Sequence, residues 1–234
     1  MIKLENYEVV GWEHAIRGMR NPMNSWDRSD TCIGFDNMQN IIDGVTQLYI
    51  GSNDHDLMMK LAKGGPVHAK YRRMITVYVD ITAPLYWWKE FDTYKVGTVA
   101  NSCSTMHKIH EKEFTLDDFS HEHLINQNIH LLNTVIDALN AHRVAYLNTT
   151  TDINANHTRL SNKACATLKK DIWWQMIQLL PSSYNQKRTI MLNYEVLVGI
   201  YKHRKNHKLD EWRVFCEWIK TLSYSEIIMS GVEE

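Results

Sequence analysis

The 234-residue chain has few cysteines, few prolines and no long apolar run. Its four cysteines, Cys32, Cys103, Cys165 and Cys216, form no CxxC pair and follow no regular spacing, which favours reduced thiols over a disulfide framework. No apolar stretch approaches the roughly 20 residues of a membrane-spanning helix, and the first ten residues lack the apolar core of a signal peptide. We therefore expect a soluble cytoplasmic protein without a membrane partner.

A surplus of charge of either sign is also missing. Lys and Arg number 26 against 27 Asp and Glu, so the formal net charge is −1. Proteins that bind nucleic acids through their phosphates usually carry a clear basic excess, and here the basic run is local, at 202–208. We expect no nucleic-acid partner. The length suits one large domain, so we take 1–234 as a single domain.

Several familiar catalytic signatures are absent. The sequence contains no GxSxG elbow, no phosphate-binding P-loop and no GxGxxG fingerprint. Two histidine pairs have helical spacing, His107 with His110 and His203 with His207, but neither has an HExxH pattern or a neighbouring thiolate pair. We therefore expect no metal site.

Hydrophobic periodicity predicts a helix-rich chain with a few strands, which is typical of the α+β class. Asn53 or Asp54 is expected to cap the helix over 54–63. The polar residues 21–30 and the polar segment between Tyr94 and Phe114 are expected to form loops. Strands are predicted over 1–10, 73–81 and 188–192, and helices over 13–19, 35–49, 54–63, 84–94, 120–147, 160–179, 193–203 and 209–222.

The polar string Asn101-Ser102-Cys103-Ser104-Thr105 follows a Trp-rich helix and carries no charge before Lys108. Such a string suits a loop that cradles a ligand, and it suits an ordinary surface loop equally well. Both interpretations stay open on the residues alone.

Two segments, GGPVHAKYRRMITVYVDITAPLYWWKEFDTYKVGTVANSCSTMHK and LLPSSYNQKRTIMLNYEVLVGIYKHRKNHKLDEW, together resemble the flavin-dependent thymidylate synthases, the ThyX family. His68 falls at the family's first motif histidine, and Ala83-Pro84 falls at the "AP" that opens a helix. Asn193 follows Pro181 by twelve positions, as in the family, and Arg204 falls at the "LR" arginine. The likeness is one of spacing and element order more than of identity.

The resemblance implies a ThyX-like α+β fold with a small mixed or antiparallel sheet. It also implies reductive methylation of dUMP to dTMP in a homotetramer, with methylenetetrahydrofolate, FAD and NADPH. Ser104 and Arg204 would then hold the nucleotide together with Asn101 and Ser102, and His68 would be the catalytic residue near the pyrimidine or folate. By the residues alone, His68 also suits a strand edge, and Arg204 suits the C-terminus of a helix.

The flavin contacts implied by the resemblance fall on Thr93, Tyr94, Lys95 and Asn193. The first three stand where the family has an Arg-His-Arg triplet if one extra residue is allowed before Asn101, and without that gap the triplet falls on Tyr94-Lys95-Val96. In both alignments only Lys95 supplies a charge. Asn193 either binds ligand or caps the helix that starts there.

Two further family arginines are replaced, by Met106 and Ile177. Together with the altered triplet, these replacements make three lost charge-assisted contacts. Each costs about 1.5–3 kcal/mol, so the three would weaken ligand binding by roughly three to six decades without compensation. Arg72, Arg73, Lys95 and the run 202–208 could compensate. The departures keep two alternatives open: a divergent enzyme acting on another pyrimidine nucleotide or without FAD, and a non-catalytic nucleotide-binding or interaction protein on the same scaffold.

Overall fold

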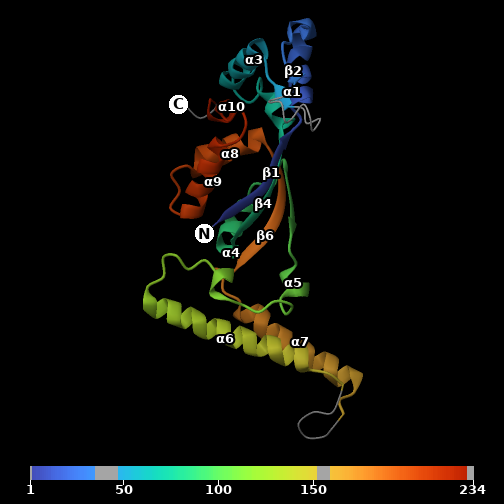
Figure 1. Ribbon diagram of the computed structural model, residues 1–234, viewed down its shortest axis with the longest axis vertical. Helices are drawn as coiled ribbons and strands as arrows, with labels where there is room; N and C mark the ends of the chain where they lie inside the picture. Colours follow the sequence, from blue (N-terminus) through green and yellow to red (C-terminus); the bar gives the residue numbers. More distant parts are fainter. Residues whose placement is uncertain (1, 35–46, 152–158, 231–234) are drawn as a thin grey trace. The chain divides into compact units, whose positions relative to one another are not determined.

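The computed structural model describes residues 2–34, 47–151 and 159–230 (Figure 1). The chain divides into two compact units. Unit 1 comprises Met1–Lys3, Thr82–Asp92 and Asn101–Arg188, and unit 2 comprises Leu4–Ile81, Thr93–Ala100 and Thr189–Glu234. Each unit is described by itself below.

The elements confirm the predicted α+β class, because the chain is rich in helix and has a small antiparallel sheet. Among the described helices, none has both the length and the apolarity to cross a bilayer. In chain order the elements are β1 (Lys3–Val10), α1 (Trp12–Arg20), η1 (Asn21–Met23), η2 (Trp26–Arg28), β2 (Cys32–Gly34), β3 (Gln47–Tyr49), α3 (Ser52–Lys63), η3 (Lys70–Arg73), β4 (Thr76–Pro84), α4 (Leu85–Phe91), β5 (Thr98–Ser102), α5 (Thr105–Lys108), η4 (Leu116–Asp118), α6 (Asn126–Asn148), α7 (Asn162–Leu179), β6 (Asn185–Asn193), α8 (Tyr194–Arg204), α9 (Asp210–Lys220) and α10 (Glu226–Met229).

The main sheet has four strands in the order β1-β4-β6-β5. Strand β4 shows why this segment is extended: Val77, Val79 and Ile81 are fully buried, whereas Tyr78 between them is exposed. Alternating β-branched residues place one apolar face of a strand against the core. β4 and β6 each contribute residues to both units.

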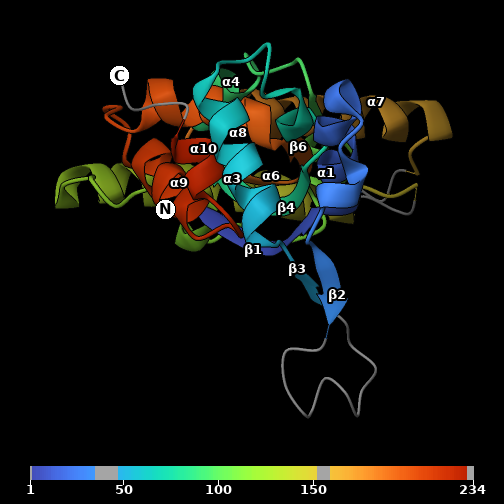
Figure 2. The same ribbon diagram turned by 90° about the horizontal axis from the view of Figure 1, so that it is seen from above.

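In unit 2, helices α3, α8, α9 and α10 pack together (Figure 2). Their core contains the fully buried Leu197, Trp212 and Phe215. Arg72, on η3, is also buried, and its Nε donates to Glu195 Oε2 at 2.8 Å. A guanidinium needs such a partner because an unpaired buried charge is strongly destabilising.

In unit 1, α6 and α7 lie side by side (Figure 1). Trp87 and Trp88 of α4 are buried, as expected for aromatic anchors, and their rings meet edge to face at 4.9 Å. The buried cluster of this unit comprises Ile109, Phe114, Phe119, Leu132, Ile136, Leu139 and Met176.

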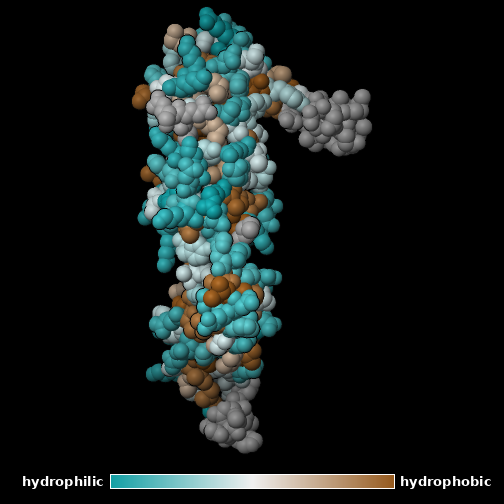
Figure 3. Space-filling view, turned by 90° about the vertical axis from the view of Figure 1, so that its left-hand side faces the viewer, coloured by the Kyte–Doolittle hydropathy of each residue, from teal (hydrophilic) through white to brown (hydrophobic). Residues whose placement is uncertain are grey.

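Apolar side chains also reach the surface of unit 1. Ile125 and Leu131 are each 64% exposed, and Leu168, Trp174 and Leu179 are exposed as well. Figure 3 shows brown, hydrophobic residues on the surface of the region that contains α6 and α7. Monomeric proteins seldom expose many large apolar side chains close together.

Several of the predicted boundaries need correction. The helix over 35–49 is wrong at 47–49, where β3 pairs antiparallel with β2, and 35–46 lie outside the described residues. The helix over 120–147 begins only at Asn126, and the N–H of Ser120 donates to Ser183 O at 2.8 Å. The helix over 84–94 ends at Phe91. The expected loop contains strand β5, Thr98–Ser102.

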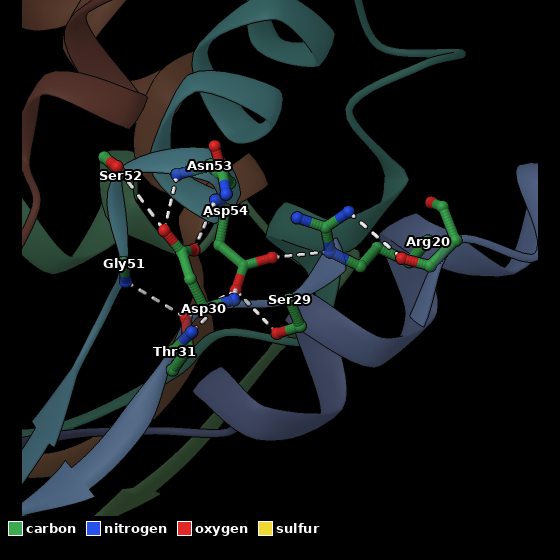
Figure 4. A network of polar contacts seen from close by, with 9 residues as sticks. Arg20, Ser29, Asp30, Thr31, Gly51, Ser52, Asn53 and Asp54 are labelled. Atoms are coloured by element: carbon green, nitrogen blue, oxygen red, sulfur yellow. Dashed lines mark hydrogen bonds and ion pairs between the residues drawn. The ribbon is translucent and has the colours of Figure 1, made fainter. Parts of the chain in front are cut away.

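The cap of α3 also differs from the prediction. Gly51 occupies the N-cap position, and the carboxylate of Asp30 accepts hydrogen bonds from the N–H groups of Asn53 at 2.9 Å and Asp54 at 3.1 Å (Figure 4). A distant residue thus satisfies the open donors of this helix. Asp54 itself is fully buried and paired with Arg20.

Candidate functional site

The residues predicted to bind ligands fall in both units. Asn101, Ser102 and Ser104 belong to unit 1, whereas His68, Thr93–Lys95, Asn193 and Arg204 belong to unit 2. The geometry is therefore described one unit at a time.

The small polar residues of the string 101–105 are explained in part by local structure. Asn101 and Ser102 are the exposed end of β5, and Thr105 begins the one-turn helix α5. Ser104 is the N-cap of that helix, with its Oγ accepting from His107 N at 3.2 Å. Serine is favoured at this position because its hydroxyl satisfies an open backbone donor.

Ser104 also lines a cavity of about 210 Å³, called here the Ser104 cavity. Three lysines and two carboxylates line it. Lys108 pairs with Glu111, and Lys112 Nζ lies 2.8 Å from Asp118 Oδ1. The lining comprises Thr82, Cys103, Ser104, Thr105, Lys108, Ile109, Lys112, Glu113, Phe114, Asp118, Tyr184, Asn185, Gln186 and Lys187, all in unit 1.

Gln186 fixes the wall of the Ser104 cavity. Its Nε2 donates to Cys103 O and to Thr105 Oγ1, both at 3.1 Å. Its own carbonyl accepts from Trp88 Nε1 at 3.0 Å, and Cys103 N donates to Lys187 O at 3.0 Å. Because Trp88 is buried, the polar string is attached to the core and its shape is set before any ligand arrives.

Two titratable groups of this cavity are shifted. Burial raises the pKa of Tyr184, helped by the nearby Asp118 and Cys103, so its phenol stays protonated and can donate. Burial alone would also raise the pKa of Asp118, but hydrogen bonds from Lys112 and the N–H and hydroxyl of Thr115 outweigh it and lower that pKa. At neutral pH the cavity therefore offers a neutral phenol beside an ionised, already paired carboxylate.

In unit 2, Arg204 is the last residue of α8, as predicted for a helix C-terminus. Its Nε donates to Tyr94 OH at 2.9 Å. Its guanidinium lies 4.7 Å from the Trp212 ring centre and 5.6 Å from that of Tyr94. Stacking on two rings fixes the orientation of the cation.

The other predicted residues of unit 2 are either exposed or make a local structural contact. Asn193 caps α8, with Oδ1 accepting from Val196 N at 3.0 Å, which supports its structural interpretation. Thr93 and Lys95 are exposed. His68 is exposed in the turn after α3, where its N–H donates to Gly65 O at 3.0 Å.

The resemblance implies FAD, whose diphosphate needs cations around it, so the positions of the candidate cations are compared with that need. Within 93–95 the one cation is Lys95, and the phenol of Tyr94 already accepts from Arg204. Arg72, a candidate for compensation, is buried against Glu195, and Arg73 is exposed. In the part of the chain that the structure describes, these residues do not form the cation cluster that a diphosphate needs.

Sequence reasoning missed the partners of Ser104, namely Lys112, Tyr184, Gln186 and Lys187. A weak signal existed, because Tyr184 and Gln186 are two apart and would share one face of a strand. The predicted strand began only at residue 188, whereas β6 begins at Asn185. The missing three residues are those that complete the cavity.

Comparisons with known proteins give structural matches alone. No family model and no curated protein sequence matches the chain. The flavin-dependent thymidylate synthase ThyX from Helicobacter pylori, solved with FAD and dUMP, is similar with a TM-score of 0.61 and 14% identity, covering 99% of both chains. The UMP/dUMP methylase PolB from Streptomyces cacaoi, bound to 5-Br dUMP, has a TM-score of 0.54 and 10% identity, covering 99% of this chain and 95% of PolB. At these identities the likeness establishes the fold.

Proposed function

We propose that this chain is an enzyme that acts on dUMP or a closely related pyrimidine nucleotide. The observation that carries the proposal is the Ser104 cavity, which is lined by a serine hydroxyl, three lysines and two carboxylates, with Lys108 and Lys112 already in ion pairs. Ammonium and hydroxyl groups are suitable partners for a monophosphate. The solved proteins of this fold include one bound to dUMP and one to its 5-bromo derivative.

The finer form of the proposal is reductive methylation of dUMP to dTMP, with methylenetetrahydrofolate, NADPH and FAD as the resemblance implies. In this form Arg204, Asn101 and Ser102 help to hold the nucleotide and His68 lies near the reacting ring. Bound FAD would supply the hydride transfer. Lys95, Tyr94, Thr93 and Asn193 would contact it, although they lack the cation cluster described above.

A second form is favoured by that missing cluster. The enzyme would use the same fold and nucleotide site without FAD, or would modify a different pyrimidine nucleotide. The visible spectrum of the purified protein, before and after incubation with FAD and removal of the excess, separates the two forms. A retained flavin spectrum supports the finer form, and loss of all flavin in the presence of dUMP supports the second.

The nucleotide site itself is tested by calorimetric titration with dUMP. Ser104→Ala and Lys108→Gln should each weaken binding about tenfold, because each removes a contact worth roughly 1.5 kcal/mol. Lys89→Gln is the matched control, since Lys89 is an exposed lysine of the same unit that does not line the cavity. Equal affinity for deoxyuridine, which has no phosphate, would contradict the proposal.

Turnover separates an enzyme from the third alternative, a non-catalytic nucleotide-binding or interaction protein. With dUMP bound and methylenetetrahydrofolate, NADPH and FAD supplied, mass spectrometry of the nucleotide should show an added methyl group. Tight dUMP binding with an unchanged nucleotide under all cofactor combinations would instead indicate a binding protein.

We also propose a homo-oligomer, with the tetramer as the finer form. The support is the exposed apolar side chains of α6 and α7, including Ile125, Leu131 and Trp174. Light scattering coupled to size-exclusion chromatography measures the mass directly, and a single 27.5 kDa species would contradict the proposal. The cytoplasm remains the predicted compartment.

A further inference from the structure

A second cavity lies in unit 1 on the opposite side of α5 and is called here the Trp173 cavity. It is an open hollow with a volume of about 610 Å³, and its lining comprises Met106, His107, His110, Tyr146, Ala166, Lys169, Lys170 and Trp173. Thr105, Lys108 and Ile109 line the Ser104 cavity. Opposite sides of the one-turn helix α5 therefore face the two cavities, which share no lining residue.

The charge of this second lining has one sign. Lys169 and Lys170 contribute ammonium groups, and no Asp or Glu belongs to the lining among the described residues. Lys169 Nζ lies 5.1 Å from the centre of the Tyr146 ring, a cation–π contact. This contact holds the ammonium group of Lys169 against the aromatic wall of the cavity.

Aromatic groups form the rest of the wall. Trp173 is held in place because its Nε1 donates to Met106 O at 2.9 Å. His110 and Tyr146 have ring centres 4.4 Å apart. The Nδ1 of His110 is buried without a hydrogen-bond partner in the described structure, and such an atom is costly unless a ligand or water meets it.

We infer that the Trp173 cavity binds a second, anionic ligand that combines a planar ring with at least two negative charges. Its volume lies within the range of about 300–1,000 Å³ that is usual for small-molecule sites. The rings of Trp173 and Tyr146 provide surfaces for a heteroaromatic group. The ammonium groups of Lys169 and Lys170 then meet phosphates or carboxylates.

The inference goes beyond the proposed function, because it concerns a separate cavity and stands without dUMP. Since α5 separates the two cavities, both ligands can be bound at once.

The experiment is a calorimetric titration at low salt with three probes: ATP, inorganic tripolyphosphate and adenosine. ATP carries both the ring and the charges, so it should bind more tightly than either partial probe. Lys169→Gln combined with Lys170→Gln should weaken ATP binding about tenfold or more, because two charge-assisted contacts are lost. Lys163→Gln, an exposed lysine on the same helix outside this cavity, should leave the affinity unchanged.

Competition distinguishes this site from the proposed nucleotide site. Saturating dUMP should not displace ATP, and Ser104→Ala should weaken dUMP without changing ATP. Absence of ATP binding at millimolar concentration, equal binding by the Lys169/Lys170 variant, or displacement by dUMP would overturn the inference. If dUMP fails to bind any variant while ATP binding still depends on the two lysines, the proposed function fails and this inference stands. Circular dichroism of each variant confirms that the helices persist.

Discussion

Replacing Asp54 by Asn should destabilise unit 2 more than an ordinary surface substitution would. The carboxylate is fully buried, and its Oδ1 accepts from Arg20 Nε at 2.6 Å. Its Oδ2 accepts from the hydroxyls of Ser29 at 2.6 Å and Thr31 at 2.7 Å, and from two backbone N–H groups (Figure 4). One charge therefore joins α1, the turn after η2 and the start of α3.

The size of the effect follows from what the amide cannot do. Its NH₂ group donates and cannot accept, so donors that met Oδ1 or Oδ2 lose their partner. Arg20, only 4% exposed, would remain as a buried cation without its counter-ion. Breaking a buried ion pair by removing one partner typically costs about 3–5 kcal/mol. For a chain of this length, 3 kcal/mol lowers the melting temperature by about 6–12 °C.

Urea and thermal unfolding of Asp54→Asn measure this loss. Asp56→Asn is the matched control, because Asp56 is exposed on the same helix, and it should change stability by less than about 0.5 kcal/mol. Combined with Arg20→Met, Asp54→Asn should cost less than the sum of the two single changes. A loss below about 1 kcal/mol for Asp54→Asn would refute the argument that this network is a major support of the unit.

The pH dependence of stability gives an independent check on the same carboxylate. Burial alone would raise the pKa of Asp54, but hydrogen bonds from Ser29, Thr31 and Arg20 outweigh it and lower that pKa. A lowered pKa in the folded state contributes stability above the unfolded value of about 3.9, and that stability is lost as the pH falls through the folded value. The wild-type protein should therefore lose more unfolding free energy on acidification than Asp54→Asn does.

Three further predictions concern other parts of the chain. Asp118→Asn should lower the unfolding free energy by about 1 kcal/mol at neutral pH, because it removes the capping box of η4. The pKa of Asp118 is lowered in the folded protein, so the wild type itself loses stability in acid, and urea melts below about pH 4 should show a smaller difference between the two proteins. Gly97→Ala should destabilise by about 1–2 kcal/mol in thermal melts, because φ is 76° and the new Cβ would lie 2.9 Å from Asn193 Nδ2. Alkylation of Cys103, an exposed thiol in the lining of the Ser104 cavity, should block dUMP binding in a Cys32→Ser background, and bound dUMP should slow the reaction measured by mass spectrometry.

Much of the fold was predictable because the local pattern and the tertiary packing agree. The segment with Val77, Val79 and Ile81 alternates as a buried strand must, and it is the strand β4. The apolar spacing of 160–179 and 193–203 likewise yields α7 and α8 within two residues of the predicted ends. In each case burial is decided by residues close together in sequence.

The misses share a different cause, because distant partners decide them. Strand β5 is mostly exposed and rich in small polar residues, so its extended form comes from pairing with β6 and not from its own composition. The cap of α3 comes from Asp30, more than twenty residues away, which no local capping pattern can predict. Residues 47–49 are extended because they pair with Cys32–Gly34.

The residues of the candidate site were also hard to predict, because distant segments supply them. Met106 occupies a family arginine position, and on that basis the sequence predicts a loss of phosphate affinity. In the structure, Met106 lines a cavity whose ammonium groups come from Lys169 and Lys170 of α7, and Ser104 lines another with Lys108 and Lys187. A cation need not stand at a motif position to reach a ligand, because a neighbouring element can bring it there. The titrations with dUMP and ATP on the lysine variants described above test whether these lysines replace the missing arginines.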